Sequence, residues 1–246
     1  MTPLAQHRIE IEKNLAAWER KPLLQKIYAG FHEQILRRVD SSVPGAIVEI
    51  GAGIGNLKGS LPRVICTDLF VQPWIDVVCD AYDLPFREAT VSHLILFDVF
   101  HHLRAPGAFL REARRVLAPR GKVLLVEPFI SFASYPVYAW LHHEPVAMSE
   151  PIDLRTQFSL PRDYYAAQGN ATRVFFRREA APLLGGWQVT HTEAFSAFAY
   201  LLSGGYSQPA LYPLAWLGLL QQADRVLSRC PRLFAARCLV ELQPRR

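Results

Sequence analysis

The stretch Val48-Glu49-Ile50-Gly51-Ala52-Gly53-Ile54-Gly55-Asn56 decides the fold. It places a glycine-rich turn directly after a short apolar run that has the character of a buried strand. Glycines in such a turn let the backbone bend sharply and let a ligand approach its N–H groups. The dinucleotide fingerprint requires a glycine at position 56, where this chain has Asn56, so the pattern disfavours a NAD site.

Short apolar runs continue on both sides of this turn. They predict strands at 46–50, 64–67, 75–79, 93–97, 122–127, 187–191 and 236–242. Runs that are apolar on both faces suit a parallel sheet covered by helices. Helical spacing predicts helices at 4–20, 22–39, 110–117 and near 209–228. The alternation predicts a doubly wound α/β fold.

Composition limits the function classes. The chain has 246 residues, of which 50% are hydrophobic and 20% charged, so it can form a large core and is not a disordered chain. A net charge of +5 suits an anionic ligand or a membrane surface but lacks the clustering of a nucleic-acid site. The four cysteines lack C-x-x-C spacing, and the N-terminus carries charges where a signal peptide is apolar. We therefore expect a cytoplasmic protein.

Three carboxylates accompany the glycine turn. Asp68 ends the second predicted strand, 17 residues after Gly51, where a carboxylate accepts both ribose hydroxyls of a nucleoside. Asp80 ends the third strand, where an acid can face an adenine amino group, and Glu49 lies next to the turn itself. This many acids repel a pyrophosphate but suit a cationic nucleoside.

Six motifs follow one another along 49–122: Glu49 to Gly55, Asp68, Asp80-Ala81, Leu84-Pro85-Phe86, Phe97-Asp98-Val99-Phe100-His101-His102-Leu103 and Pro119-Arg120-Gly121-Lys122. In this order they resemble the class I S-adenosylmethionine-dependent methyltransferases, and most of all the small-molecule group that includes the quinone C-methyltransferases. The resemblance covers 44–128 well and the last two strands weakly.

The resemblance implies a Rossmann-like sheet of seven strands with the last strand antiparallel, and S-adenosylmethionine as cofactor. It implies that Asp68 holds the ribose hydroxyls, that Asp80 and Ala81 meet the adenine, and that Glu49 orders the loop and holds the cofactor's ammonium. Phe97 and Asp98 would lie near the sulfonium. The full cofactor set that it implies is Glu49, Gly51, Ala52, Gly53, Gly55, Asp68, Leu69, Asp80, Ala81, Phe97, Asp98 and Val99.

The segment 128–185 interrupts the regular spacing and predicts an inserted helical cap after the fifth strand. We expect an N-terminal helical segment at 1–43 and a methyltransferase domain at 44–246, with this cap and an apolar insertion at 195–230. The N-terminal helices and the cap would form a lid over the acceptor. Predicted acceptor contacts are Tyr28, Tyr138, His142, His143 and Arg173. Further cap arginines would bind a carboxylate or phosphate if they converge, or form a solvated face: Arg155, Arg162, Arg177 and Arg178.

His101 and His102 are the candidate catalytic bases, because they follow the fourth strand and histidine titrates near neutral pH. No metal is expected: adjacent histidines such as His142 and His143 point apart on a helix, and no third ligand has clear spacing.

We expect in-line methyl transfer to a small-molecule or lipid-linked acceptor, with O-methylation favoured. C-methylation of a quinone-like or polyketide ring is the alternative, and a non-catalytic cofactor-binding or membrane-docked protein is an alternative of another class. Nucleic acid is not an expected partner, because no Asn/Asp-Pro-Pro-aromatic run follows the fourth strand. The apolar tract 195–220 predicts either core packing or a peripheral membrane contact assisted by Arg225, Arg229 and Arg232.

Overall fold

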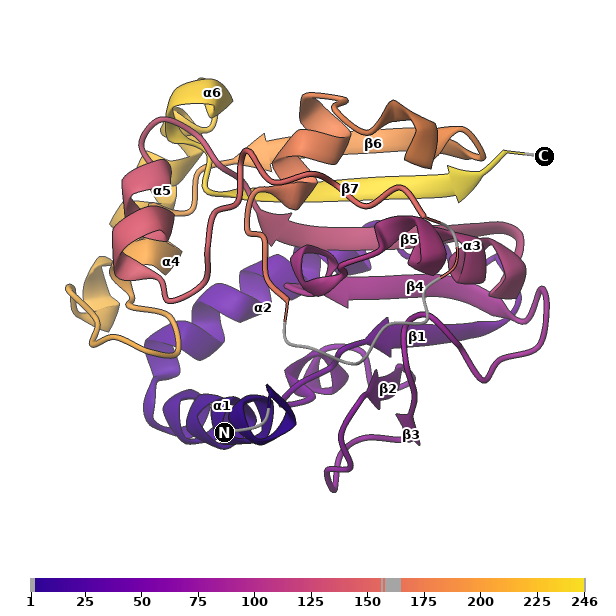
Figure 1. The fold of residues 1–246 in the computed structure, drawn as a ribbon. Helices are drawn as coiled ribbons and strands as arrows, with labels where there is room; N and C mark the ends of the chain where they lie inside the picture. Colours follow the sequence, from indigo (N-terminus) through magenta and orange to yellow (C-terminus); the bar gives the residue numbers. More distant parts are fainter. Residues whose placement is uncertain (1–2, 156, 158–164, 246) are drawn as a thin grey trace.

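The computed structural model describes residues 3–155, 157 and 165–245. A seven-stranded sheet in the order β3-β2-β1-β4-β5-β7-β6 forms its centre (Figure 1). Neighbours from β3 to β5 pair in parallel, and β7 runs antiparallel to both β5 and β6. The predicted Rossmann-like sheet with an antiparallel last strand is confirmed. The strands are β1 (Ala46–Ile50), β2 (Ile65–Asp68), β3 (Val77–Val78), β4 (Val91–Phe97), β5 (Leu117–Pro128), β6 (Trp187–Phe195) and β7 (Arg237–Pro244).

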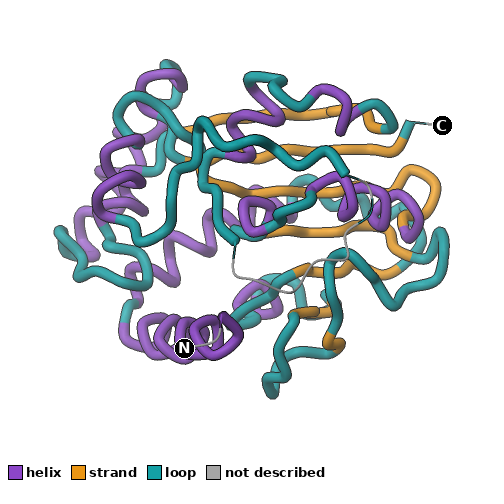
Figure 2. The backbone as a smooth tube through the Cα atoms, in the orientation of Figure 1, coloured by secondary structure: helices purple, strands orange, loops and turns teal. Residues whose placement is uncertain are grey.

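Helices cover both faces of the sheet, and short helical turns connect the strand ends (Figure 2). The α-helices are α1 (Pro3–Arg20), α2 (Pro22–Leu36), α3 (Pro106–Val116), α4 (Phe198–Leu202), α5 (Leu217–Leu227) and α6 (Pro231–Phe234). The short turns are η1 (Asn56–Gly59), η2 (Phe100–His102), η3 (Val137–Leu141), η4 (Thr172–Phe176), η5 (Ala181–Leu184) and η6 (Leu214–Trp216). The glycine turn leads into η1, a 3₁₀ turn of four residues.

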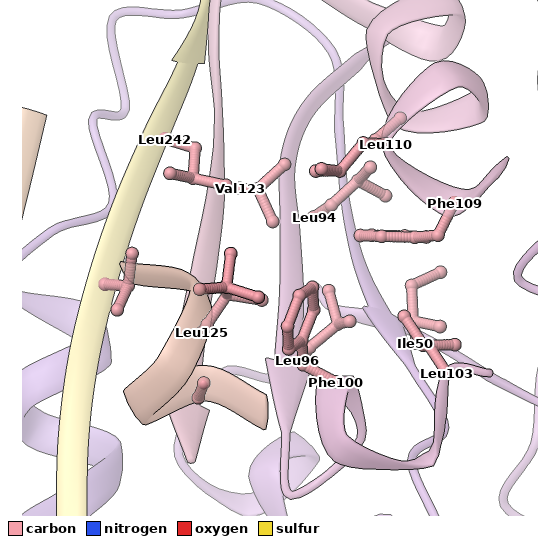
Figure 3. Packing of buried hydrophobic residues seen from close by; sticks show 14 of the residues in the cluster. Ile50, Leu94, Leu96, Phe100, Leu103, Phe109, Leu110, Val123, Leu125 and Leu242 are labelled. Carbon is pink, nitrogen blue, oxygen red and sulfur yellow. The ribbon is translucent and has the colours of Figure 1, made fainter. Parts of the chain in front are cut away.

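The two faces of the strands belong to different cores because side chains alternate along a strand. Leu94 and Leu96 of β4 pack against α3, as Figure 3 shows for Phe109 and Leu110 of that helix. Ile95, between them, packs with the residues of α2 on the opposite face. All three strand residues are fully buried, which explains why their run is apolar on both faces.

The predicted cap consists of short turns within the described residues. η3 and η4 are single π-helical turns and η5 is a 3₁₀ turn. The predicted boundary between the N-terminal helical segment and the domain at residue 44 stays a prediction. The helix α2, which precedes this boundary, packs into the same core as β1 and β4, which follow it. Within the described part of the chain, no helix has the length and apolar character needed to cross a bilayer.

Candidate active site

A cavity of about 1660 Å³ lies at the carboxyl ends of β1, β2 and β4. Parallel sheets bind ligands at this edge, because the loops that follow the strands converge there. Of the predicted cofactor residues, all except Gly55 line the cavity, and so do His101 and His102. Tyr28, Tyr138, His142 and His143 line it as well, which brings most of the predicted acceptor contacts to the same place.

The glycine turn requires glycine for two separate reasons. Gly51, Gly53 and Gly55 have φ of +65°, +53° and +68°, in the left-handed region that disfavours side chains. A Cβ atom at Gly51 would lie 2.7 Å from Cγ2 of Val99, and at Gly55 it would lie 2.6 Å from the ring of Trp74. The turn therefore has backbone shape and close packing that a larger residue would disturb.

Asp68 links the second strand to this turn. Its Oδ2 atom accepts a hydrogen bond of 2.9 Å from the backbone N–H of Gly53, and its Oδ1 atom accepts one of 3.3 Å from Phe70. The Trp74 indole donates to the carbonyl of Gly53 at 2.8 Å. The carboxylate is buried and lines the cavity. Asp68 thus orients the glycine turn, and it lies where the resemblance places the ribose.

Glu49 is buried beneath the turn and has an unusual titration. Burial raises the pKa of Glu49 to about 8; the hydrogen bond from the Cys66 thiol opposes this shift, and the negative charge of Asp68 adds to it. The side chain is therefore protonated at neutral pH in the cofactor-free protein. A cation placed beside it would stabilise the ionised form.

We predict that the stability of the cofactor-free protein falls as pH rises between about 4.5 and 8, relative to a Glu49→Gln variant. The unfolded chain ionises Glu49 near its ordinary pKa while the folded chain keeps the proton, so the folded state binds more protons across this window. The difference in unfolding free energy should change by up to ~1.4 kcal/mol per pH unit. Urea denaturation of both proteins from pH 5 to 8 measures it, and parallel curves would contradict the prediction.

An arginine–aspartate pair closes the inner end of the cavity. Asp98 follows β4 with φ of +57°, a conformation that Asp tolerates better than most residues. Its Oδ1 atom lies 2.7 Å from Nη1 of Arg237, at the start of β7. Arg237 is buried, and its guanidinium lies 5.2 to 5.4 Å from the ring centroids of Phe97, Phe31 and Tyr200.

Aromatic rings surround this pair. Tyr28 stacks on Phe97 with ring centroids 5.1 Å apart and 24° between the planes. Tyr200 and Tyr206 meet Tyr28 edge to face at 6.1 and 5.4 Å. The cavity wall near the end of β4 is therefore aromatic, and three of its rings are tyrosines that carry hydroxyl groups.

A histidine–glutamate cluster lies on the other side of the β4 end. Glu127, at the end of β5, accepts backbone hydrogen bonds from Val99 and Phe100 at 2.8 and 2.6 Å. The same carboxylate lies 2.6 Å from Nδ1 of His101. From the cap, the two carboxylate oxygens of Glu144 lie 3.5 Å from Nε2 of His101 and 3.4 Å from Nε2 of His102.

The two neighbouring imidazoles differ in charge at neutral pH. Burial disfavours the charged form of His101, but the carboxylates of Glu127 and Glu144 outweigh it and raise its pKa to about 10. Burial and the positive charge of His101 lower the pKa of His102 to about 4. At neutral pH, His101 thus holds its proton and His102 is neutral, so the prediction of a general base applies to His102.

Sequence comparison identifies the domain. Residues 48–125 match the family model of a methyltransferase domain. Among curated proteins, none matches this chain. One chain of the complex between the Haloferax volcanii Trm112 methyltransferase activator and a methyltransferase is similar in structure, with a TM-score of 0.57 and 16% identity over 100% of this chain and 99% of that one. A SAM-dependent methyltransferase from Thermotoga maritima has a TM-score of 0.55 and 12% identity over 96% and 99%.

The chain contains a methyltransferase domain with the class I fold. At these identities the solved structures support the fold alone, while the family match over β1 to β5 covers the glycine turn and the strand ends. The cofactor that the sequence motifs imply for this methyltransferase domain is S-adenosylmethionine. The acidic edge described above suits this cation better than a pyrophosphate.

The structure does not bring every predicted residue to the cavity. Arg173 of the methyltransferase is buried away from it, bonded to Glu179 at 2.6 Å and to the carbonyls of Ala147 and Glu150. Arg155 pairs with Asp153 at the surface, so these arginines do not converge on an anion. Arg162 lies outside the described residues. Arg173 thus links segments of the cap, and Arg155 pairs with an acid of its own surface segment.

Sequence reasoning did not connect three residues with the histidines and Asp98 of the site. Glu127 and Glu144 act on the histidines from 26 and 43 positions away, with no periodic pattern to announce them. Arg237 gave a usable signal, because it is a lone charge in the apolar run of the last strand. A charge in a strand that is otherwise buried requires a partner, and here the partner is Asp98.

Proposed function

We propose that this methyltransferase transfers the methyl group of S-adenosylmethionine to a hydroxyl oxygen of a small-molecule or lipid-linked acceptor. The observation that carries the proposal is the histidine–glutamate cluster of His101, His102 and Glu144. All three residues line the cavity. The two histidines follow shortly after Phe97 and Asp98, which the resemblance places near the sulfonium. A hydroxyl is a poor nucleophile until it loses its proton, and this cluster supplies groups that remove one.

The step requires alignment before chemistry. The acceptor oxygen attacks the methyl carbon in line with the carbon–sulfur bond, and that bond breaks with its electron pair on sulfur, which leaves S-adenosylhomocysteine. The hydroxyl proton leaves at the histidine–glutamate cluster. Alignment of two bound reactants can contribute on the order of 7–11 kcal/mol. The aromatic wall of Tyr28 and Phe97 favours a planar acceptor beside the sulfonium.

Product analysis tests this proposal. Methyl-labelled S-adenosylmethionine is incubated with the protein and a panel of phenols, sugars, quinols and extracts of polar lipids, and the labelled product is located by mass spectrometry and NMR. We expect an O–CH₃ signal and at least about tenfold slower turnover in His102→Ala. His191→Ala, which removes a histidine on β6, is the control. A C–CH₃ product would establish the ring-methylating alternative, and S-adenosylmethionine binding without transfer to any acceptor would favour the non-catalytic one.

A lipid-linked acceptor is supported by the surface beside the cavity mouth. Trp216, Leu219 and Val226 form an exposed apolar stripe along η6 and α5. Arg225, Arg229 and Arg232 are exposed next to it. The one acid in 209–234, Asp224, is buried and accepts hydrogen bonds from the N–H groups that begin α4. This surface is therefore apolar and cationic, which is the combination that binds anionic lipid surfaces.

We predict that the protein sediments with vesicles of phosphatidylglycerol more than with vesicles of phosphatidylcholine, and that Leu219→Glu reduces this binding by about tenfold. The substitution places a negative charge in the apolar stripe without touching the core, since Leu219 is exposed. Val71→Glu, at an exposed apolar residue after β2, is the matched control. Equal sedimentation with both lipids, or equal loss in both variants, would remove the lipid surface from the proposal.

A further inference from the structure

We propose that His101, His102 and Glu144 form a binding site for one divalent transition-metal ion of the Zn²⁺ class inside the acceptor pocket. One ligand atom from each of the three residues lies within 4.8 Å of the others. Two of the residues come from η2, after β4, and the third comes from the cap, so the site joins the sheet to the segment that covers it.

The distances fit a shared ion. Two ligands that are each ~2.1 Å from a tetrahedral ion lie ~3.4 Å apart. Glu144 lies 3.5 Å from Nε2 of His101 and 3.4 Å from Nε2 of His102. A direct charge-assisted hydrogen bond between such groups is shorter, at about 2.7–2.9 Å. Glu144 thus has the spacing of a shared ligand to each histidine, through Oε2 to His101 and through Oε1 to His102.

The remaining ring nitrogens have the partners typical of metal-binding histidines. Such histidines donate their second N–H to a carboxylate or a backbone carbonyl, which fixes the ring and its tautomer. Nδ1 of His101 lies 2.6 Å from the carboxylate of Glu127, and Nδ1 of His102 lies 2.9 Å from the carbonyl oxygen of Tyr165. Both arrangements direct Nε2 toward Glu144, and an ion bound there would displace the proton that His101 carries at neutral pH.

Further polar groups surround the same point. Nδ1 of His142 lies 3.7 Å from Glu144, and the amide nitrogen of Gln168 contacts the same carboxylate. Gln168 is buried, and among the described residues its amide oxygen has no hydrogen-bond partner. The carboxylate of Glu144 thus has polar neighbours from the cap as well as the two histidines.

The ligand chemistry selects the ion. Two imidazoles and one carboxylate suit Zn²⁺, Fe²⁺, Mn²⁺ or Co²⁺, whereas Mg²⁺ and Ca²⁺ prefer oxygen ligands throughout. A second group, Asp98, His101 and Glu127, is also close enough to share an ion. There, Asp98 pairs with Arg237, and Glu127 already accepts several N–H groups, so this second group carries no proposal.

The consequence for catalysis rests on the proposed function. An ion at this site would bind the acceptor hydroxyl and lower its pKa, so that the proton passes to solvent and the oxygen attacks as an alkoxide or phenolate. The lone pair of His102 would then serve the ion, and His102 would not act as a general base. Chelation of the ion would slow methyl transfer without preventing S-adenosylmethionine from binding.

Metal titration tests the site without relying on activity. Metal-free full-length protein is titrated with Zn²⁺ by calorimetry and with Co²⁺ by visible absorption. We expect one ion per chain. We expect His102→Ala and Glu144→Gln each to weaken binding by about 100-fold or more, and Glu127→Gln to weaken it by about 10–100-fold through the orientation of His101. His191→Ala, which removes a histidine elsewhere, should bind as the wild type does.

The outcomes separate this inference from the proposed function. Each sample is also titrated with S-adenosylmethionine and melted to show that it is folded. Absence of a one-to-one metal complex in folded, cofactor-binding protein would overturn the metal site and leave methyl transfer standing. Equal metal affinity in wild type and His102→Ala would overturn it as well, because the ion would then lie elsewhere. Metal binding without methyl transfer to any acceptor would support the site and contradict the proposed function.

Discussion

Replacing Asp68 by alanine is expected to weaken S-adenosylmethionine binding by about 100-fold or more. A carboxylate at the end of β2 can accept hydrogen bonds from both ribose hydroxyls. Hydrogen bonds to a charged group are worth about 1.5–3 kcal/mol each, and 1.4 kcal/mol is a factor of about ten in affinity. The variant also loses the 2.9 Å hydrogen bond that orients the N–H of Gly53.

Calorimetric titration of S-adenosylmethionine and S-adenosylhomocysteine measures this effect. The affinity of Asp68→Asn should lie between those of the wild type and Asp68→Ala, because the amide oxygen of asparagine still accepts one hydrogen bond. Asp76→Ala is the matched control: Asp76 binds Lys58 and the N–H of Cys66 but does not line the cavity. An unchanged affinity in Asp68→Ala would remove this residue from the cofactor site. A loss of equal size in Asp76→Ala would show that the effect is structural.

Replacing Arg237 by alanine is expected to lower the free energy of unfolding by up to about 3 kcal/mol, because Arg237 is buried while the side chain of its partner Asp98 keeps 28% of its surface exposed. The substitution leaves the carboxylate of Asp98 without the cation that lies 2.7 Å away. It also removes the guanidinium from between the rings of Phe31, Phe97 and Tyr200. Both losses occur at the inner wall of the cavity.

Urea denaturation of four proteins separates charge from packing. The double variant Asp98→Asn with Arg237→Met removes both charges and refills the space, so it should recover more than half of the loss. Asn is chosen because residue 98 has a positive φ. Arg37→Ala breaks an exposed ion pair with Glu33 and should cost less than about 1 kcal/mol. A cost for Arg237→Ala as small as that of Arg37→Ala would contradict a stabilising role for the pair.

Local signals were sufficient for the fold and the cofactor edge. The glycine turn at 51–55 needs no distant information, because left-handed backbone and close packing exclude other residues at Gly51 and Gly55. Strands that are apolar on both faces require helices on both faces, and parallel strands joined by crossovers bring their carboxyl ends to one edge. Asp68, Asp80 and Asp98 therefore reach one cavity as a consequence of topology.

Long-range packing produced what the sequence reasoning missed. The prediction that His142 and His143 point apart assumes a regular helix, whereas both follow the π-helical turn η3 and their rings stack with centroids 4.8 Å apart. In the 3₁₀ turn η2, the ring centroids of His101 and His102 lie 4.2 Å apart. Glu144 meets them because the cap folds back over the strand ends. Its position depends on side-chain contacts between segments far apart in the chain, and such contacts leave no periodic pattern.

The amino-acid sequence by itself determined the sheet, the glycine turn and the acidic cofactor edge of this methyltransferase. Alternation and backbone sterics act over a few residues and can be followed along the chain. Only the tertiary structure decided which of the two histidines holds a proton, which residues gather around them, and that Arg237 pairs with Asp98. Those properties depend on burial and on distances across the fold, and a carboxylate several ångströms nearer or farther changes the charge of an imidazole.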